Sequence, residues 1–187
     1  MDGNGVLFGC ESSILNDNRN PGVSKKDAED IFATYYGVEK FVWLKGVAGQ
    51  DITDFHIDGF VKLVNSNTMI TMSEEDLEEW GLSSSDITTL RSATNVDGTP
   101  YKIVNIPLTQ NKLKLRDTLF KGSYINFYVG NKVVLVPAYS DPNDSVARNI
   151  IAGLYPGRRV VSIEVTKLYA NGGMIHCVTQ QQPCRQA

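Results

Sequence analysis

The sequence predicts an α/β (α+β) fold assembled from a strand-strand-helix-strand unit that occurs three times. The first observation behind this is the element order, which returns at a spacing of about 60 residues. The second is composition: 187 residues with 42% hydrophobic and 21% charged residues are ordinary for a globular domain with a core. Because repeated units bury a face only against their neighbours, we expect one domain with units at 1–50, 51–122 and 123–187.

The first unit follows a glycine-rich start that resembles a hairpin turn, Met1–Gly5. Ser24, with Asp27 three residues on, is a helix N-cap candidate, and Gly37 can close the helix. The expected elements, two strands, a helix and a third strand, are Val6–Gly9, Ser12–Leu15, Ala28–Tyr36 and Lys40–Leu44.

The second unit begins with two strands joined by Asn-Ser-Asn, Ile57–Val64 and Thr68–Met72. The acidic stretch Ser73–Trp80 is expected to be a solvated helix or a lid. A helix at Ser85–Asn95 and a strand at Tyr101–Ile106 complete this unit.

The third unit follows a basic, polar connector, Pro107–Gly122. Two strands around the turn Gly130-Asn131 are expected first, then a helix with Asp141 as N-cap and Pro142 at its first position. The strands are Tyr124–Val129, Lys132–Val136, Arg159–Val165 and Met174–Thr179, and the buried stripe of the helix is Val146, Ile150, Ile151 and Leu154.

Composition excludes several classes of protein. A net charge of −3 does not suggest a nucleic-acid partner, and no apolar run approaches the length of a membrane span. Three cysteines are an odd count without metal-ligand spacing, which favours reduced thiols in the cytoplasm, no metal and no cofactor. Of these, Cys10 and Cys184 have no evident partners and are expected to be inert.

Two distant stretches carry candidate chemistry. Gly172 and Gly173 lead into a short apolar run with Cys177, where a ligand can approach the main chain closely. A cysteine in such a run is more often a buried small hydrophobe than a nucleophile. His56 and Asp58, expected on a strand, would share one face because side chains alternate. Thiol, imidazole and carboxylate together are the parts of a covalent thiol mechanism.

The other histidine of the chain, His176, is interpreted differently. Alternation along the expected last strand points it away from the face that carries Cys177. A packing role is therefore favoured for this residue.

Seven stretches in order resemble the agmatine deiminase and Porphyromonas-type peptidylarginine deiminase family of guanidine-modifying enzymes. They are spread along the whole chain: Leu15–Pro21, Gly37–Leu44, Asp51–Asp58, Tyr124–Tyr128, Val136–Asp144, Tyr155–Arg158 and Gly172–Pro183.

This resemblance implies a fold and a reaction. The family fold is the pentein, an α/β propeller of five strand-strand-helix-strand units, of which this chain would hold the last three. Cys177 would attack the central carbon of a guanidinium group, and His56 would protonate the leaving ammonia and then activate water. Asp58 would bind two guanidinium nitrogens, and Asp51 would assist the loop or orient His56. Gly172 and Gly173 would line the substrate side or shape the entry to the last strand.

The resemblance leaves the substrate and the activity open. Agmatine, giving N-carbamoylputrescine and ammonia in putrescine biosynthesis, is the first choice, and peptidylarginine is the alternative. The family also has an Asp and a Glu that bind the guanidinium group in earlier units and have no counterpart here, so an inactive C-terminal fragment is a further alternative. Partners are expected to be a small cationic substrate and a second copy of the chain, with no nucleic acid or membrane. A further departure from the family pattern is Phe55, where a small or polar residue is usual.

Overall fold

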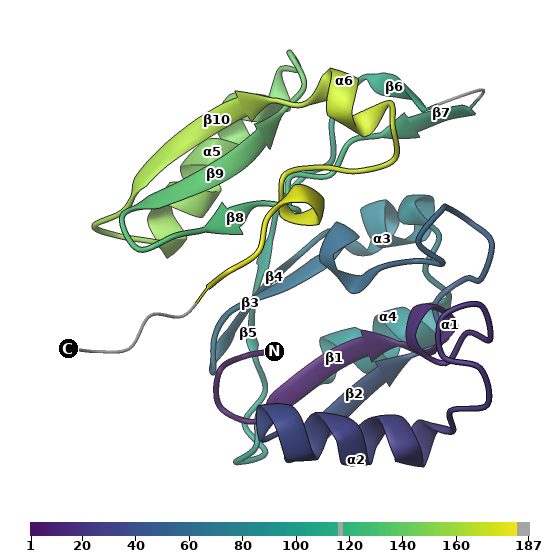
Figure 1. The fold of residues 1–187 in the computed structure, drawn as a ribbon. Helices are drawn as coiled ribbons and strands as arrows, with labels where there is room; N and C mark the ends of the chain where they lie inside the picture. Colours follow the sequence, from purple (N-terminus) through teal and green to yellow (C-terminus); the bar gives the residue numbers. More distant parts are fainter. Residues whose placement is uncertain (116–117, 183–187) are drawn as a thin grey trace. The chain divides into compact units, whose positions relative to one another are not determined.

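The computed structural model describes residues 1–115 and 118–182. It is a mixed α/β structure with short strands and helices, and it divides into two compact units (Figure 1). The first unit comprises Met1–Asn105, and the second runs from Ile106 onward. The α/β prediction is confirmed at this level.

The first unit opens with a two-stranded parallel sheet, β1 (Val6–Cys10) and β2 (Lys40–Leu44). Two helices, α1 (Glu11–Ile14) and α2 (Lys25–Tyr36), connect the strands. The predicted capping of α2 is confirmed: Ser24 and Asp27 form a reciprocal capping box, and Gly37 ends the helix at φ +64°.

One predicted strand of this unit is wrong. Ser12–Leu15 overlaps α1, whose turn closes with a hydrogen bond of 2.8 Å from Leu15 N to Glu11 O. The amide of Ser12 donates to Lys45 O at 3.0 Å, a partner 33 residues away in sequence. Because that contact is not local, the apolar spacing alone could not reveal the helix.

A three-stranded sheet follows in the same unit, formed by β3 (Val61–Asn65), β4 (Thr68–Thr71) and β5 (Lys102–Asn105). A 3₁₀ turn, η1 (Ile57–Gly59), precedes it, so the strand expected to begin at Ile57 begins at Val61 instead. The acidic stretch forms α3 (Glu74–Trp80), and α4 (Ser84–Arg91) follows. These elements and the residues that flank them contribute fully buried side chains to the core: Phe60, Met69, Ile70, Met72, Leu77 and Leu90.

The second unit begins with a hairpin, β6 (Lys112–Leu115) and β7 (Thr118–Lys121), inside the stretch expected to be a plain connector. Its main sheet consists of β8 (Tyr128–Val129), β9 (Val133–Ala138) and β10 (Arg159–Glu164). The remaining elements are α5 (Asn143–Leu154), α6 (Thr166–Tyr169) and a 3₁₀ turn, η2 (His176–Val178). A last strand at Met174–Thr179 is therefore a wrong prediction.

The stripe predicted for α5 is also partly wrong. The helix begins at Asn143 with Pro142 as its N-cap, one residue later than expected. Val146 is 44% exposed, whereas Ala147 and Ile151 are fully buried. The buried face is therefore narrower than apolar periodicity indicated, since Ala147 and Ile151 lie one turn apart on it.

The two three-stranded sheets share one pairing pattern. In each, the first two strands form an antiparallel hairpin (β3–β4 and β8–β9), and the middle strand pairs in parallel with the strand after the helix (β4–β5 and β9–β10). The β1–β2 pair shows the parallel half of this pattern. Within residues 1–115 and 118–182 the strands form four separate sheets, none of them closed, and no helix is both long and apolar enough to cross a membrane.

Candidate functional site

Cys177 is an exposed residue within η2, with a free thiol. Gly172 precedes it at φ +91°, a conformation that favours glycine. A Cβ added at Gly173 would lie 3.4 Å from Cys177 Cβ and 3.9 Å from Cys177 Sγ. The double glycine therefore turns the chain and keeps the space beside the thiol free of a side chain.

Asn126, a residue to which the sequence pattern assigns no role, anchors this turn through hydrogen bonds. It is fully buried, and its Oδ1 accepts a hydrogen bond of 2.8 Å from the His176 amide and one of 3.6 Å from Cys177 Sγ. The His176 amide also donates to the Asn126 carbonyl at 3.2 Å. A buried amide side chain needs such hydrogen-bond partners. An asparagine inside the apolar stretch Tyr124–Tyr128 is therefore the feature of the sequence that indicates a structural role for Asn126.

An aromatic cluster supports the stretch before Cys177. The Tyr139 hydroxyl donates at 2.7 Å to Ser123 O and contacts Met174 Sδ at 2.9 Å. The Tyr139 ring meets the rings of Tyr124 and Tyr169 edge to face, with centroids 5.4 and 5.7 Å apart. Burial holds the pKa of Tyr139 well above its ordinary value, so the hydroxyl stays a neutral donor.

His56 and Asp58 belong to the first unit. His56 is exposed and is the residue directly before η1, and Asp58 is half-buried within that turn. The predicted strand alternation does not apply to them, because a 3₁₀ turn spaces side chains by three residues instead of two. Gly59 completes the turn, and a Cβ there would lie 3.0 Å from the indole ring of Trp80.

Asp51 folds the loop that leads to His56. Its Oδ1 accepts hydrogen bonds from Thr53 N at 2.7 Å, Thr53 Oγ1 at 2.6 Å and Phe55 N at 3.3 Å. Thr53 Oγ1 in turn accepts a hydrogen bond of 3.2 Å from the His56 amide. These contacts favour a loop-supporting role for Asp51 over direct contact with a substrate.

The structure groups the predicted site residues into two sets. Gly172, Gly173 and Cys177 lie together in the second unit, and Asp51, His56 and Asp58 lie within eight residues of chain in the first. That the two sets face one cavity stays a prediction. His176, whose orientation was argued from a strand, instead anchors η2 through its amide.

Neither Cys10 nor a metal site adds to the candidate chemistry among the residues that the structure describes. Cys10 is buried, and burial raises the pKa of its thiol to about 12, which makes it a poor nucleophile at neutral pH. Cys184 lies outside the described residues. Among residues 1–115 and 118–182, no group of three or more His, Cys, Asp or Glu side chains is placed to hold a metal ion.

Comparison with known proteins identifies relatives along nearly the whole chain. The family model described as Porphyromonas-type peptidyl-arginine deiminase matches residues 1–183. The agmatine deiminase of Pseudomonas fluorescens is 29% identical over 205 residues, which cover 100% of this chain and 56% of that protein. The chain thus spans about half the length of the curated relatives it matches.

Solved structures are similar over the same extent. A Porphyromonas gingivalis protein provisionally named an arginine deiminase superposes with a TM-score of 0.87 at 31% identity, covering 98% of this chain and 55% of that one. The agmatine deiminase of Enterococcus faecalis gives a TM-score of 0.86 at 25% identity, with coverage of 98% and 55%.

Proposed function

Because the chain belongs to the Porphyromonas-type peptidyl-arginine deiminase family, we propose that it carries the nucleophile half of a site that hydrolyses guanidinium groups. The observation that carries the proposal is the free thiol of the exposed residue Cys177, which donates a hydrogen bond to the buried Asn126 and lies beside Gly173, a residue without a side chain. A nucleophile needs this combination of access and fixed position.

The chemistry runs in two stages. Cys177 Sγ attacks as a thiolate, forms a bond to the central guanidinium carbon, and pushes an electron pair onto nitrogen. The carbon–nitrogen bond then breaks, and His56 gives the leaving nitrogen its proton, so that ammonia departs. Water, deprotonated by the now neutral His56, adds to the same carbon. The carbon–sulfur bond breaks, which regenerates the Cys177 thiolate, and the added hydroxyl group loses its proton to water as the ureido product leaves.

Asp58 and Asn126 have supporting roles in this proposal. A carboxylate can bind two guanidinium N–H groups side by side, which is the role we assign to Asp58. Asn126 positions Cys177, because its Oδ1 accepts hydrogen bonds from both the His176 amide and the Cys177 thiol. Asp51 supports the loop that carries His56.

Agmatine is the first proposed substrate, with N-carbamoylputrescine and ammonia as products for putrescine biosynthesis. The relative from Pseudomonas fluorescens that is named agmatine deiminase, at 29% identity, supports this choice. Peptidylarginine is the alternative, and the description of the matching family model favours it. A panel of agmatine, arginine and a blocked arginyl peptide, compared for how well each protects Cys177 from alkylation, separates the two without requiring turnover.

For the whole molecule we propose that the repeats are part of a five-unit pentein propeller. The shared pairing pattern of β3–β4–β5 and β8–β9–β10 supports this arrangement. Since the chain spans about half of its relatives, we expect it to release little or no ammonia from agmatine by itself. We also propose that copies of this chain associate with one another, so that sedimentation would show an assembly larger than 20.7 kDa.

The nucleophile assignment is tested by covalent labelling. A haloacetamidine resembles a guanidinium group, so it should alkylate Cys177 faster than the neutral haloacetamide does, as peptide mass mapping would report. Cys177→Ala removes that adduct and leaves any slow reaction of Cys10 unchanged. Equal rates of the two reagents at Cys177 would contradict the assignment.

A further inference from the structure

The loop before His56 is held in an unusual backbone conformation. Asp54 and Phe55 are consecutive non-glycine residues with φ of +58° and +76°, where L side chains are strained. His56 follows them directly and returns to an extended conformation at φ −66° and ψ 139°. Since strain persists only where surrounding contacts impose it, contacts outside the loop must hold Asp54 and Phe55.

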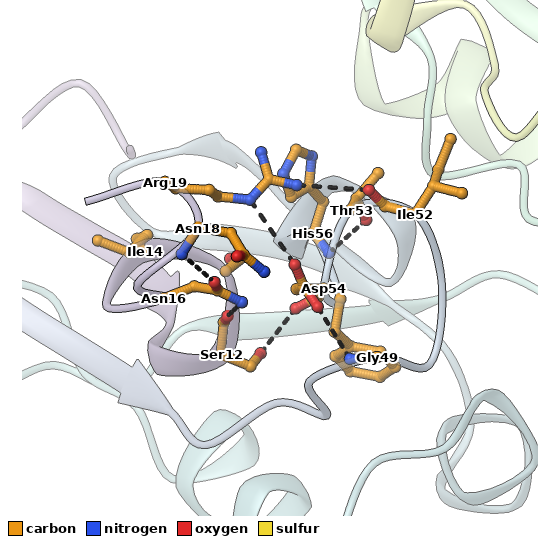
Figure 2. A network of polar contacts seen from close by, with 12 residues as sticks. Ser12, Ile14, Asn16, Asn18, Arg19, Gly49, Ile52, Thr53, Asp54 and His56 are labelled. Atoms are coloured by element: carbon orange, nitrogen blue, oxygen red, sulfur yellow. Dashed lines mark hydrogen bonds and ion pairs between the residues drawn. The ribbon is translucent and has the colours of Figure 1, made fainter. Parts of the chain in front are cut away.

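Those contacts converge on Asp54, as Figure 2 shows. Ser12 Oγ donates a hydrogen bond of 2.7 Å to the Asp54 carbonyl. The Gly49 amide donates to Asp54 Oδ1 at 2.8 Å, and Arg19 Nε lies 3.9 Å from Asp54 Oδ2. Arg19 Nη2 also donates to the Ile52 carbonyl at 3.4 Å. From outside the loop, Ser12 therefore fixes the main chain of Asp54 and Arg19 contacts its side chain, while Gly49 holds that side chain from within the loop.

Ser12 is itself fixed against the neighbouring chain. Its amide donates to Lys45 O, and a Cβ at Gly46 would lie only 2.2 Å from Ser12 Oγ. Gly46 has φ +64°, so glycine is required there for both conformation and space. These contacts fix Ser12 of helix α1 in the position from which its hydroxyl donates the hydrogen bond to the Asp54 carbonyl.

Arg19 comes from Leu15–Pro21, a stretch to which the proposed reaction assigns no task. The stretch is folded by its own asparagines. The Asn18 amide donates to Asn16 Oδ1 at 2.8 Å, and Asn20 Nδ2 donates to Ile14 O at 2.7 Å. Asn16 Nδ2 donates to Ser12 O at 3.2 Å, which ties the stretch to α1. Its ordered shape directs Arg19 toward the loop 49–56 (Figure 2).

We infer that Ser12, Arg19 and Asp54 are positioning residues for His56. They impose the left-handed pair Asp54-Phe55, and this pair sets the direction in which the chain enters η1. Within the loop, the Thr53 hydroxyl donates a hydrogen bond to Asp51 and accepts one from the His56 amide, which fixes the amide relative to the loop. The inference rests on the proposed function only in taking His56 as the acid–base group, and its geometry is independent of Cys177.

The experiment uses the full chain labelled with ¹⁵N at histidine. The chain has only two histidines, His56 and His176, so each amide and each imidazole can be assigned, and His176 serves as an internal control. Ser12→Ala and Asp54→Ala should speed amide exchange at His56 by about fivefold, the effect of losing one ordinary hydrogen bond. Exchange at His176 should not change.

Conservative variants separate positioning from general folding. Asp54→Asn keeps an acceptor for the Gly49 amide and tolerates positive φ, so it should restore most of the His56 protection that Asp54→Ala loses. Gly46→Ala and Gly37→Ala impose the same strain at the same φ of +64°, but only the first displaces Ser12 Oγ. Only Gly46→Ala should therefore alter the His56 signals.

The inference is overturned if the His56 signals stay unchanged in Ser12→Ala and Gly46→Ala, or if both histidines respond equally. This readout differs from labelling at Cys177. An altered His56 without amidine-directed labelling would retain the positioning role and remove the proposed reaction. Amidine-directed labelling of Cys177 together with His56 signals that do not change in the variants would retain the proposed reaction and remove the positioning role.

Discussion

At Phe55 two residue-level effects oppose each other. The backbone angle of +76° favours glycine, which is consistent with the small residue expected there from the family pattern. The side chain, however, is 2% exposed and its ring centroid lies 5.2 Å from that of Phe60. Burial of an aromatic ring therefore offsets the strain of the backbone.

The balance at Phe55 predicts the sign of a substitution. Phe55→Gly should relieve about 1–2 kcal/mol of strain but lose about 3–5 kcal/mol of aromatic packing. We therefore expect the free energy of unfolding to fall by about 2 kcal/mol in a denaturant titration. A variant more stable than the parent would mean that strain outweighs packing.

The two glycines before Cys177 are predicted to have different roles. Gly172→Ala places a side chain at φ +91° and should cost about 1–2 kcal/mol of stability. Gly173→Ala lacks that strain, and its methyl group would make an ordinary contact 3.4 Å from Cys177 Cβ. It should leave unfolding unchanged and slow alkylation of Cys177 severalfold. If Gly173→Ala reacts as fast as the parent, the space beside the thiol does not control access.

At the scale of elements, those specified by residues near in sequence were predictable, and those that depend on distant residues were not. Helix α2 could be predicted because Ser24, Asp27 and Gly37 all lie within its own termini. The 3₁₀ turn η2 was mistaken for a strand, because its anchor is Asn126, 50 residues earlier. The same holds for α1, which depends on Lys45. Candidate site residues were recognisable by type, but their local geometry depends on these long-range hydrogen bonds.

The start of helix α5 provides an element-scale prediction about pH. Asp141 is 7% exposed and accepts hydrogen bonds from the amides of Gln110, Asn111 and Asn143 at 2.9–3.0 Å. Burial by itself would raise the pKa of the Asp141 carboxyl, but these amides outweigh it and lower the pKa below its ordinary value. A lowered pKa stabilises the fold above about pH 4, and this stabilisation is lost as pH falls through the folded-state pKa.

Asp141→Asn should consequently destabilise the protein by about 2 kcal/mol at pH 7, and the difference should shrink at pH 3. Urea titrations at both values measure it, with Asp97→Asn, an exposed aspartate, as the matched control. A difference that stays constant between pH 7 and pH 3 would show that the Asp141 charge contributes nothing.

At the scale of the whole molecule, the repeated element order was predictable for two of the three expected units, since β3–β4–β5 and β8–β9–β10 have the same pairing. The first expected unit has helix α1 in place of its second strand. The division between the two compact units falls after Asn105, two residues before the connector expected at Pro107–Gly122. Cys177 lies in one compact unit, and His56 and Asp58 lie in the other. The proposed reaction therefore requires functional groups from both units to act on one substrate.

The most direct measurement of that requirement is the effect of Asp58→Asn on the labelling of Cys177. The ratio of haloacetamidine to haloacetamide rates at Cys177 should fall by about tenfold or more, because a carboxylate that binds the amidine contributes roughly 1.5–3 kcal/mol. The rate with the neutral reagent should stay the same. An unchanged ratio would show that Asp58 and Cys177 do not share a site, and it would contradict the proposed function.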